Sequence, residues 1–585
     1  MRLVIALGFA LAFLSEDAAC CVSTDALIQS PEKSTELDRS AFTFLNWDLN
    51  LRIETASESL SVRGKITMRN DSDQPQRQIP LQISSSLKWA SIKQNGSSIP
   101  FTASKVRSDL DHSGNVQEAA ITLPVPLSPG ASLELEVGYS GTVSLDTTRL
   151  AQLGAPLAAR VASDYDRITP SFTCLRGVGH VLWFPVSISP AILAQGNRVF
   201  EETSAWAVRH SMSRMTLNIS DSDVPEIDYF SANAQKFGFV SNGQLGHGLR
   251  TFSWYHLGLS GPVLVGAQYR SVLARNDVNS VFTIRFLPEH EAQADDYARV
   301  IRNTVAPIIR NSKFPPLASV LELPEAEDST FEADTILLTP LKTIDRKSLE
   351  VTTAYMLAHQ TLWSPRAWIY AGAAHLAQAL MREQQDGRAA AISYMQQRLT
   401  PLLLVDSTAP ESAKSSSLVN TTSEVFFRTK AMYVWWMLRE AVGQRVLLDS
   451  LQQYDPDVDK EPSYIQKLLE KNSHKDLEWF FDDWVYQDRG LPEFTASNGY
   501  ARASLQGIYL VSATIENKGA AAAEVPVIVH TDKGDVPTRQ RVPGHSKVAV
   551  RIEVGSRPIE LTVNDGSVPE ADRSDNITPI RIATQ

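Results

Sequence analysis

The sequence has 585 residues, of which 43% are apolar and 21% charged, and its formal net charge is −11. This length allows three or four domains at roughly 150 residues each, and the composition is that of an ordinary globular protein. The acidic balance, without any run of Lys and Arg, argues against a nucleic-acid partner and against binding to an anionic membrane surface.

Residues 1–21 are predicted to form a signal peptide. Arg2 supplies a positive charge before the apolar run from Leu3 to Leu14, and this run is too short to span a bilayer easily. The small residues that follow lead to Cys20, which either lies at a cleavage site or carries a lipid anchor. We therefore expect an exported protein, periplasmic or extracellular, with no transmembrane segment after the signal peptide.

The sequence has one cysteine beyond Cys20 and Cys21, namely Cys174. A single cysteine cannot build an internal disulfide framework, so the fold must hold without one. Cys174 is predicted to be a small buried apolar residue rather than a nucleophile.

Alternating residues predict an antiparallel β domain over residues 40–250. Apolar and polar residues alternate over 45–53, 60–68 and 133–139, and turn residues separate these stretches. Such alternation is typical of strands with one buried face. In the first stretch the residues expected on that face are Leu45, Trp47, Leu49, Leu51 and Ile53. The stretch from 190 to 250 shows no clear pattern.

An α/β pattern begins near residue 255 and continues to about residue 495. A helix is predicted over 295–310, between apolar runs that indicate strands at 263–266, 282–287 and 317–323. Beyond the helix pair at 354–375 the chain is predicted to be helical to about residue 487, with a polar loop over 406–423.

Two helices are predicted to meet at Ser364-Pro365. The first includes residues 354–363. Ser364 would cap the second helix, and Pro365 would occupy its first position, where the missing backbone N–H has no partner to lose.

The C-terminal residues 500–585 return to alternation. Three strands are predicted over 509–515, 525–529 and 548–554, with turn residues between them. A small β-sandwich of immunoglobulin-like type is the fold that this spacing favours.

The helix pair resembles the zinc-binding helices of the M1 aminopeptidase family, the gluzincins, whose motifs are H-E-L-A-H-Q-W and W-L-N-E-G-F-A. The run from Leu357 to Gln360 matches the end of the first motif, and Trp368, Gly372 and Ala374 match the second. The resemblance implies an α+β multidomain protein.

Further segments carry the same resemblance. Residues 425–443 resemble the family's Y-x-K-G-x-x-V-x-x-M-L-R-x-x-x-G helix. Residues 476–492 resemble the helix and turn that close the M1 catalytic unit. On this resemblance, residues 40–250 are an M1-like N-terminal β domain. Residues 255–495 are then a thermolysin-like peptidase-type domain with a helical extension.

The residues that would carry the chemistry depart from the family's pattern. Tyr355 stands at the first histidine ligand, and Met356 stands at the glutamate that activates water. Ala371 stands at the third ligand, and Arg428 stands at the tyrosine that stabilises the oxyanion. His359 remains as the single matching ligand.

Two of these positions have an alternative register, and a third residue is a candidate for substrate binding. Spacing alone puts the third ligand on Gln378, and a slip of one residue puts the oxyanion group on Phe427. Glu332 lies where the family carries G-A-M-E-N, whose glutamate holds the substrate's free amine. The other interpretation of Glu332 is a solvated carboxylate on an edge strand.

A zinc hydrolase needs three protein ligands, an open position for water and a nearby base. We therefore expect no zinc cofactor, and an exported M1-like protein that is catalytically inactive and binds or scaffolds a peptide or protein. The alternative is a zinc-dependent metallopeptidase with an atypical site around His359, using His375 and Glu332. A third hypothesis makes the C-terminal sandwich an adhesion or docking module.

Overall fold

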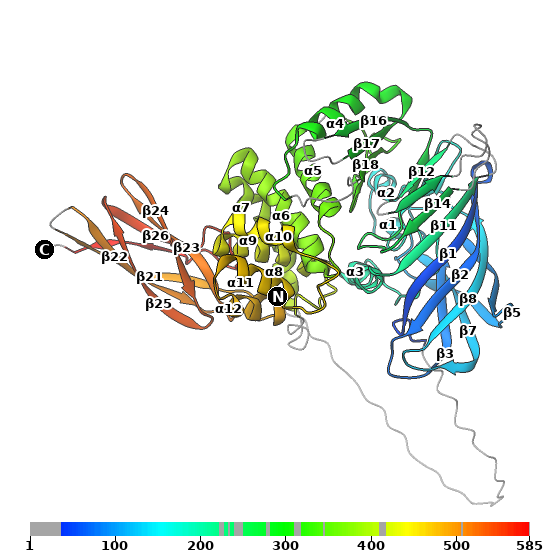
Figure 1. Ribbon diagram of the computed structural model, residues 1–585, viewed down its shortest axis with the longest axis horizontal. Coiled ribbons are helices and arrows are strands. Elements are labelled where there is room, and N and C mark those ends of the chain that lie inside the picture. The colour runs from blue at the N-terminus through cyan, green and yellow to red at the C-terminus, as the bar shows by residue number, and fades with distance from the viewer. Residues whose placement is uncertain are drawn as a thin grey trace, which may run out of the picture. The chain divides into compact units, whose positions relative to one another are not determined.

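The computed structural model describes residues 37–221, 227–231, 234–238, 250–275, 281–308, 317–342, 345–408, 417–504 and 507–583 (Figure 1). The predicted signal peptide and Cys20 lie outside the described residues, as do several parts of the stretch from 190 to 250. In the described ranges, no helix is long and apolar enough to cross a membrane.

The N-terminal part is built from three sheets. The largest has the strand order β13-β14-β11-β1-β2-β8-β4-β5, and the other two have the orders β3-β7-β6 and β12-β15-β10-β9. The strands are β1 (Phe42–Glu54), β2 (Ser59–Asn70), β3 (Gln76–Ser84), β4 (Leu87–Gln94), β5 (Ser97–Ser98), β6 (Phe101–Arg107), β7 (Asn115–Leu127), β8 (Ser132–Thr142), β9 (Arg167–Ile168), β10 (Phe172–Leu175), β11 (Arg214–Asp221), β12 (Asp228–Ser231), β13 (Gln235–Gly238), β14 (Arg250–Trp254) and β15 (Leu264–Ala267).

The strands predicted over 45–53, 60–68 and 133–139 are confirmed as parts of β1, β2 and β8. Two details differ from expectation. A register shift between Phe44 and Asn46 leaves Leu45 only half-buried, because a bulge disturbs the alternation of the faces. The large sheet is also mixed rather than purely antiparallel, since β1 pairs in parallel with β11.

One helix of this part has no counterpart in the predicted elements. Helix α3 (Arg198–His210) buries Trp206 and His210, whose rings stack with centres 4.7 Å apart. The remaining helices here are short: η1 (Thr55–Ser57), α1 (Thr148–Gln152) and α2 (Leu157–Ser163). Cys174 on β10 is buried and unbonded, which confirms its predicted place in the core.

A five-stranded sheet follows, with the order β16-β17-β18-β20-β19. Its central strands pair in parallel, and its edge strands are antiparallel to their neighbours. The predicted helix over 295–310 begins earlier and ends at residue 303, where Thr304 turns to extended backbone. The elements are β16 (Arg270–Arg275), β17 (Val281–Phe286), η2 (Pro288–His290), α4 (Glu291–Asn303), β18 (Leu317–Glu322), β19 (Phe331–Ala333) and β20 (Ile336–Thr339).

Two long helices come next, α5 (Arg346–Thr361) and α6 (Ala367–Asp386). The predicted start of the second helix is wrong by two residues, because the backbone at Arg366 is still extended, although Ser364 accepts the Arg366 N–H as a capping serine would. The Ser364 hydroxyl lies 2.8 Å from the Tyr454 hydroxyl and accepts the Arg366 backbone N–H at 3.0 Å. Helix α6 therefore begins after Arg366.

Shorter helices and two π-helical turns complete this part of the chain. They are α7 (Arg388–Gln396), α8 (Leu399–Thr408), the π turn η3 (Val425–Lys430), α9 (Ala431–Val442), α10 (Gln444–Gln453), α11 (Tyr464–Ser473), α12 (Glu478–Phe481) and the π turn η4 (Asp482–Tyr486). A buried ion pair between Lys430 and Asp488 joins η3 to the segment after η4, with both side chains at most 3% exposed.

The C-terminal strands form two four-stranded sheets, with the orders β25-β22-β21-β28 and β24-β23-β26-β27. The strands predicted over 509–515, 525–529 and 548–554 are confirmed as parts of β22, β23 and β25. All bounds are β21 (Phe494–Ala503), β22 (Tyr509–Asn517), β23 (Ala523–Thr531), β24 (Gly534–Val542), β25 (Ser546–Val554), β26 (Pro558–Val563), β27 (Ile577–Pro579) and β28 (Arg581–Ile582).

Candidate functional site

Two histidines and a tyrosine meet where α5 packs against α6. Tyr355 and His359 are one helical turn apart on α5, and their ring centres lie 4.4 Å apart. His375 of α6 places its ring centre 5.3 Å from that of Tyr355. Tyr370 covers the other side of His359, with ring centres 4.3 Å apart. The structure thus brings His359 and His375 against the same tyrosine.

His359 is a buried, neutral imidazole. Its side chain belongs to a residue that is 5% exposed, and neither ring nitrogen has a hydrogen-bond partner among the described residues. Burial lowers the pKa of His359 well below its usual range, and His375 and Arg428 lower it further. The neutral ring carries one N–H and one lone pair, and both are unsatisfied.

His375 is held in one tautomer by Gln378. Its Nδ1 lies 2.8 Å from Gln378 Oε1, and because this oxygen can only accept, Nδ1 carries the proton. Burial, assisted by the nearby Arg428 guanidinium, lowers the pKa of His375 to about 3. Nε2 therefore keeps a lone pair, for which the described residues offer no donor.

The positions expected for the activating glutamate and the third ligand are apolar and buried. Met356 and Ala371 are each 2% exposed and belong to the hydrophobic core. Gln378, the alternative third position, is 5% exposed and is engaged by His375. No group of three or more His, Cys, Asp or Glu side chains that could hold a metal ion occurs in the part of the chain that the structure describes.

Glu332 lies on the edge strand β19 and is half-buried. Its Oε1 accepts a hydrogen bond from the Thr352 hydroxyl of α5 at 3.0 Å. Burial raises the pKa of Glu332, whereas Thr352, Arg428 and Arg398 lower it. Both arginines therefore lie close enough to Glu332 to act on its charge.

Arg428 comes from the π turn η3. It forms an ion pair with Glu424 one turn earlier, and its Nε is buried with no acceptor among the described residues. Phe427, the alternative oxyanion position, is 2% exposed and packs in the core. A π turn holds more residues than an α turn, and this local widening explains why the sequence alone left two registers open.

A cavity of about 930 Å³ opens beside His375 and Arg428. Its walls come from α3, α6, α8 and η3, and its volume is within the range of sites for small molecules and short peptides. The described residues that line it are Asn197, Phe200, Glu201, Ser204, His375, Arg398, Thr400, Pro401, Leu404, Val405, Thr422, Ser423, Glu424, Val425, Phe426, Arg428, Thr429 and Met432.

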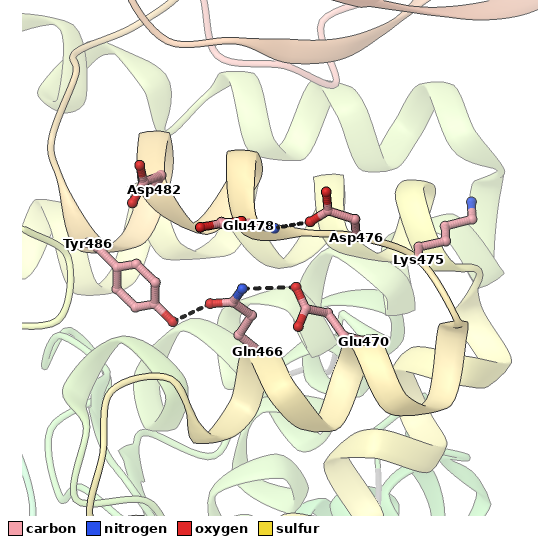
Figure 2. Close-up of a pocket in the computed structure, with 7 residues that line it drawn as sticks. All are labelled: Gln466, Glu470, Lys475, Asp476, Glu478, Asp482 and Tyr486. Atoms are coloured by element: carbon pink, nitrogen blue, oxygen red, sulfur yellow. Dashed lines mark hydrogen bonds between the residues drawn. The ribbon is translucent and has the colours of Figure 1, made fainter.

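A second, smaller cavity of about 370 Å³ lies between α11 and the segment leading into η4 (Figure 2). Three of its polar side chains are hydrogen-bonded in a row. Tyr486 donates to Gln466 Oε1 at 2.6 Å, and Gln466 Nε2 donates to Glu470 Oε1 at 2.9 Å. Glu470 also accepts the backbone N–H of Leu477. This network closes the α11–α12 turn, so it has a structural explanation.

Comparison with known proteins gives similarity at the level of solved structures. No protein-family model matches the sequence, and no curated protein sequence matches it either. A crystal structure of the M1 zinc metallopeptidase from Deinococcus radiodurans, a mutant bound to a Tyr-Ser-Ala substrate, is 15% identical with a TM-score of 0.46. The alignment covers 77% of this chain and 95% of the chain in that crystal structure.

Other M1 structures give similar values. The Deinococcus radiodurans M1 zinc metallopeptidase has a TM-score of 0.44, and a two-domain M1 mutant bound to L-tryptophan has a TM-score of 0.45. Both are 15% identical and cover 77% of this chain, and 94% and 96% of their own chains are covered. Similarity at this level does not by itself establish a shared fold, so the M1 resemblance rests on the residues described above.

Two parts of the site were missed in the sequence. Arg398 belongs to no motif, and it reaches the cavity through the packing of the segment between α7 and α8. Helix α3 lies in the stretch without a clear pattern. A signal was nevertheless present, because apolar and polar residues alternate with a helical period between Gly196-Asn197 and His210-Ser211.

Proposed function

We propose that this protein is an M1 peptidase-like protein without a working zinc site, which acts by binding a peptide or another protein. The observation that carries the proposal is the burial of Met356 and Ala371 in the core beside His359. These positions would hold the base and a ligand in an M1 enzyme, and neither side chain has a donor atom suited to zinc.

The donors around His359 do not fit a zinc ion. Its ring contacts are Tyr355, which burial keeps protonated by raising its pKa, and Tyr370. His375 adds one nitrogen beside the same phenol, and within the described residues no carboxylate or thiolate joins the two imidazoles in a group that could hold a metal. Missing ligands remove most of the roughly 10–16 kcal/mol available from a structural-type zinc site.

The absence of a catalytic base and of an oxyanion-stabilising tyrosine also supports an inactive protein. Absence of the base costs about 10²–10⁴-fold in rate even with a metal present. The oxyanion-stabilising group accounts for about 10²–10³-fold in comparable enzymes. These factors belong to one site and do not simply multiply, but either of them is enough to suppress turnover.

The organisation that goes with this proposal is an M1-like β domain over 40–250 and a thermolysin-like domain over 255–495. An immunoglobulin-like sandwich over 500–585 completes it, and we propose that the protein is exported. The mixed five-stranded sheet ahead of the α5–α6 pair and the two C-terminal sheets support this division.

One observation favours a second candidate, an active metallopeptidase with an atypical site. His359 and His375 together keep three buried ring nitrogens without partners among the described residues. Buried polar atoms in folded proteins are nearly always satisfied. A metal bound to both imidazoles, with Glu332 at the cleft edge, would account for them.

Metal analysis separates the two candidates. Untagged protein purified without added zinc is expected to contain far less than one zinc per chain, and to show no chelator-sensitive hydrolysis of aminoacyl substrates. About one zinc per chain, lost in His359→Asn but kept in the exposed control His474→Asn, would overturn the proposal. The triple variant Tyr355→His, Met356→Glu, Ala371→Glu is expected to gain zinc if the cleft keeps the M1 shape.

A further inference from the structure

The cavity beside His375 has an apolar wall built from several elements. Phe200 of α3 is 59% exposed, and Leu404 of α8 is 58% exposed. Further apolar side chains in the lining are Pro401, Val405, Val425, Phe426 and Met432. Large apolar side chains that are exposed together in a concave site are typical of a ligand-binding surface.

Two guanidinium groups share this cavity and have donors to spare. Arg398 lies over the Tyr394 ring, 3.6 Å from its centre, and donates from Nη1 to the Tyr394 carbonyl at 3.1 Å. Within the described residues, no carboxylate forms an ion pair with Arg398. Arg428 has Glu424 as a partner, but its Nε–H is buried without an acceptor among those residues.

The two arginines act on the same neighbours. Besides burial, both Arg428 and Arg398 lower the pKa of His375, and both also lower that of Glu332. Both arginines also line the cavity together with His375, so the cavity wall carries two positive charges. A guanidinium binds a carboxylate through two parallel N–H···O bonds, and this pairing is the strongest that a planar donor fork makes.

The acidic residues of the lining do not cancel this preference. Glu424 is engaged by Arg428, and Glu201 is exposed on α3 on a different wall. Glu332 is not among the lining residues, and its Oε1 is occupied by Thr352. An incoming anion therefore meets Arg398, which has no carboxylate partner among the described residues.

We propose that the cavity binds an apolar molecule by its free carboxylate, with Arg398 as the main anion contact and the partly exposed Arg428 guanidinium as the second positive charge. The apolar part of the ligand packs against Phe200 and Leu404. This inference rests on the proposed binding function and names its ligand class. The free C-terminus of a peptide ending in an apolar residue has this chemistry, and so does a small aliphatic acid.

Calorimetric titration of the full chain tests this directly. N-acetyl-Leu-Leu with a free carboxylate is expected to bind at least 10-fold more tightly than its C-terminal amide. Arg398→Gln should weaken binding of the acid at least 10-fold and abolish the difference between acid and amide. Arg445→Gln serves as the control, because Arg445 is 95% exposed and outside the cavity; it should bind like the parent protein.

Three results would overturn the inference: equal binding of acid and amide, no binding of either, or normal binding by Arg398→Gln. Circular dichroism confirms folding of each variant. Leu404→Ser provides a second route, because it should weaken N-acetyl-Leu-Leu more than N-acetyl-Ala-Ala while keeping the preference for the acid.

Two further comparisons distinguish the kind of ligand, and separate failure of this inference from failure of the proposed function. If 4-methylpentanoic acid binds as tightly as the dipeptide acid, the ligand is a small acid, and if it binds much more weakly, the ligand is a peptide C-terminus. A metal-free protein that binds acid and amide equally retains the proposed function and loses this inference. Stoichiometric zinc with peptide hydrolysis removes the proposed function itself.

Discussion

At the scale of single residues, Met356 decides how the core beside His359 should respond to substitution. Its side chain is an unbranched thioether, and the residue is 2% exposed in the core. Flexible methionine side chains fill irregular gaps in cores. The position is therefore expected to tolerate apolar changes and to reject charge.

Met356→Glu alone is expected to lower the free energy of unfolding by about 3 kcal/mol, because it buries a carboxylate without a designed partner. Met356→Leu keeps volume and polarity, so its cost should stay below about 1.5 kcal/mol. Urea unfolding at neutral pH measures both. Equal stability of Met356→Glu and the parent would show that the pocket is polar and hydrated.

Acidification should destabilise the protein through the buried histidines. His359 and His375 have pKa values below that of an unfolded imidazole, about 6.5. As pH falls below that value the unfolded chain binds more protons than the folded chain, so the free energy of unfolding decreases. Above about pH 7 this decrease has not begun. Between pH 7.5 and 5.5 the free energy of unfolding falls by about 1 kcal/mol for each histidine.

Unfolding of His375→Asn at those two pH values checks the sign and the size. Asparagine keeps a polar group for Gln378 but does not titrate, so this variant should lose about 1 kcal/mol less than the parent on acidification. His474→Asn is the matched control, since His474 is exposed and its positive φ of 56° suits asparagine. An identical pH dependence in His375→Asn and the parent would contradict the assignment.

A spacing of four residues predicts that Tyr355 and His359 share one face of α5, and their rings are in contact. The contact of His375 with Tyr355 depends instead on how α6 packs against α5. Arg398 could not be predicted, because its place depends on how α7 and α8 fold back onto α6, and no local pattern encodes that path. The half-burial of Leu45 was missed for a similar reason, since a bulge depends on the partner strand.

At the scale of elements, the contact between α6 and α9 depends on Gly372. A Cβ at this position would lie 2.6 Å from Ala431 Cβ and 3.0 Å from Trp435 Cδ1. Trp435 also stacks on Trp368, with ring centres 5.1 Å apart. The glycine of the matched motif therefore has a packing role that is independent of any metal.

Gly372→Ala is expected to destabilise the protein by about 1–2 kcal/mol. Alanine gains about 1 kcal/mol of helix propensity, but overpacking a tight helix contact typically costs about 1–3 kcal/mol or more. Adding Ala431→Gly should recover part of the loss, so the double variant should be more stable than the sum of the single effects. A more stable Gly372→Ala, measured by thermal unfolding, would show that the helices can move apart freely.

Strands were easier to predict than α3. Alternation identified β1, β2, β8, β22, β23 and β25, because each has one apolar face. The buried face of α3 includes Ser204 and His210, which interrupt the apolar period that marks a helix. His210 is accommodated by stacking on Trp206, a tertiary contact that the sequence does not show.

At the scale of the whole molecule, the C-terminal sheets are tied to the helical part by specific contacts. Trp484 Nε1 donates to the Ala522 carbonyl at 2.7 Å, and the Ala522 N–H donates to Asp483 at 2.8 Å. Arg388 bridges Glu440 and Asp565. The order of the parts was predictable from their different periodicities, but these connections were not.

Ending the chain after Pro492 is expected to produce aggregation, because it uncovers the fully buried Trp484 and removes the Ala522 backbone that accepts its indole N–H and donates to Asp483 Oδ2. Size-exclusion chromatography measures this. A monomeric, folded truncation would contradict the expectation.

Partner binding through the C-terminal sheets is better tested with Tyr500→Ser and Leu510→Ser, since both side chains are largely outside the core.

The π turn η3 contains more residues than an α turn would, and it therefore shifts which residues of the following helix α9 face its neighbours. Glu424 lies before the turn, and its last residue, Lys430, is held by the ion pair with Asp488. Which side chain lines the cavity beside His375 therefore depends on how many residues the turn contains. Excising one residue between these ends would let the turn relax to α spacing and bring another side chain into Arg428's place. The number of residues in this turn therefore decides which side chain lines the cavity, as much as the identity of any single residue does.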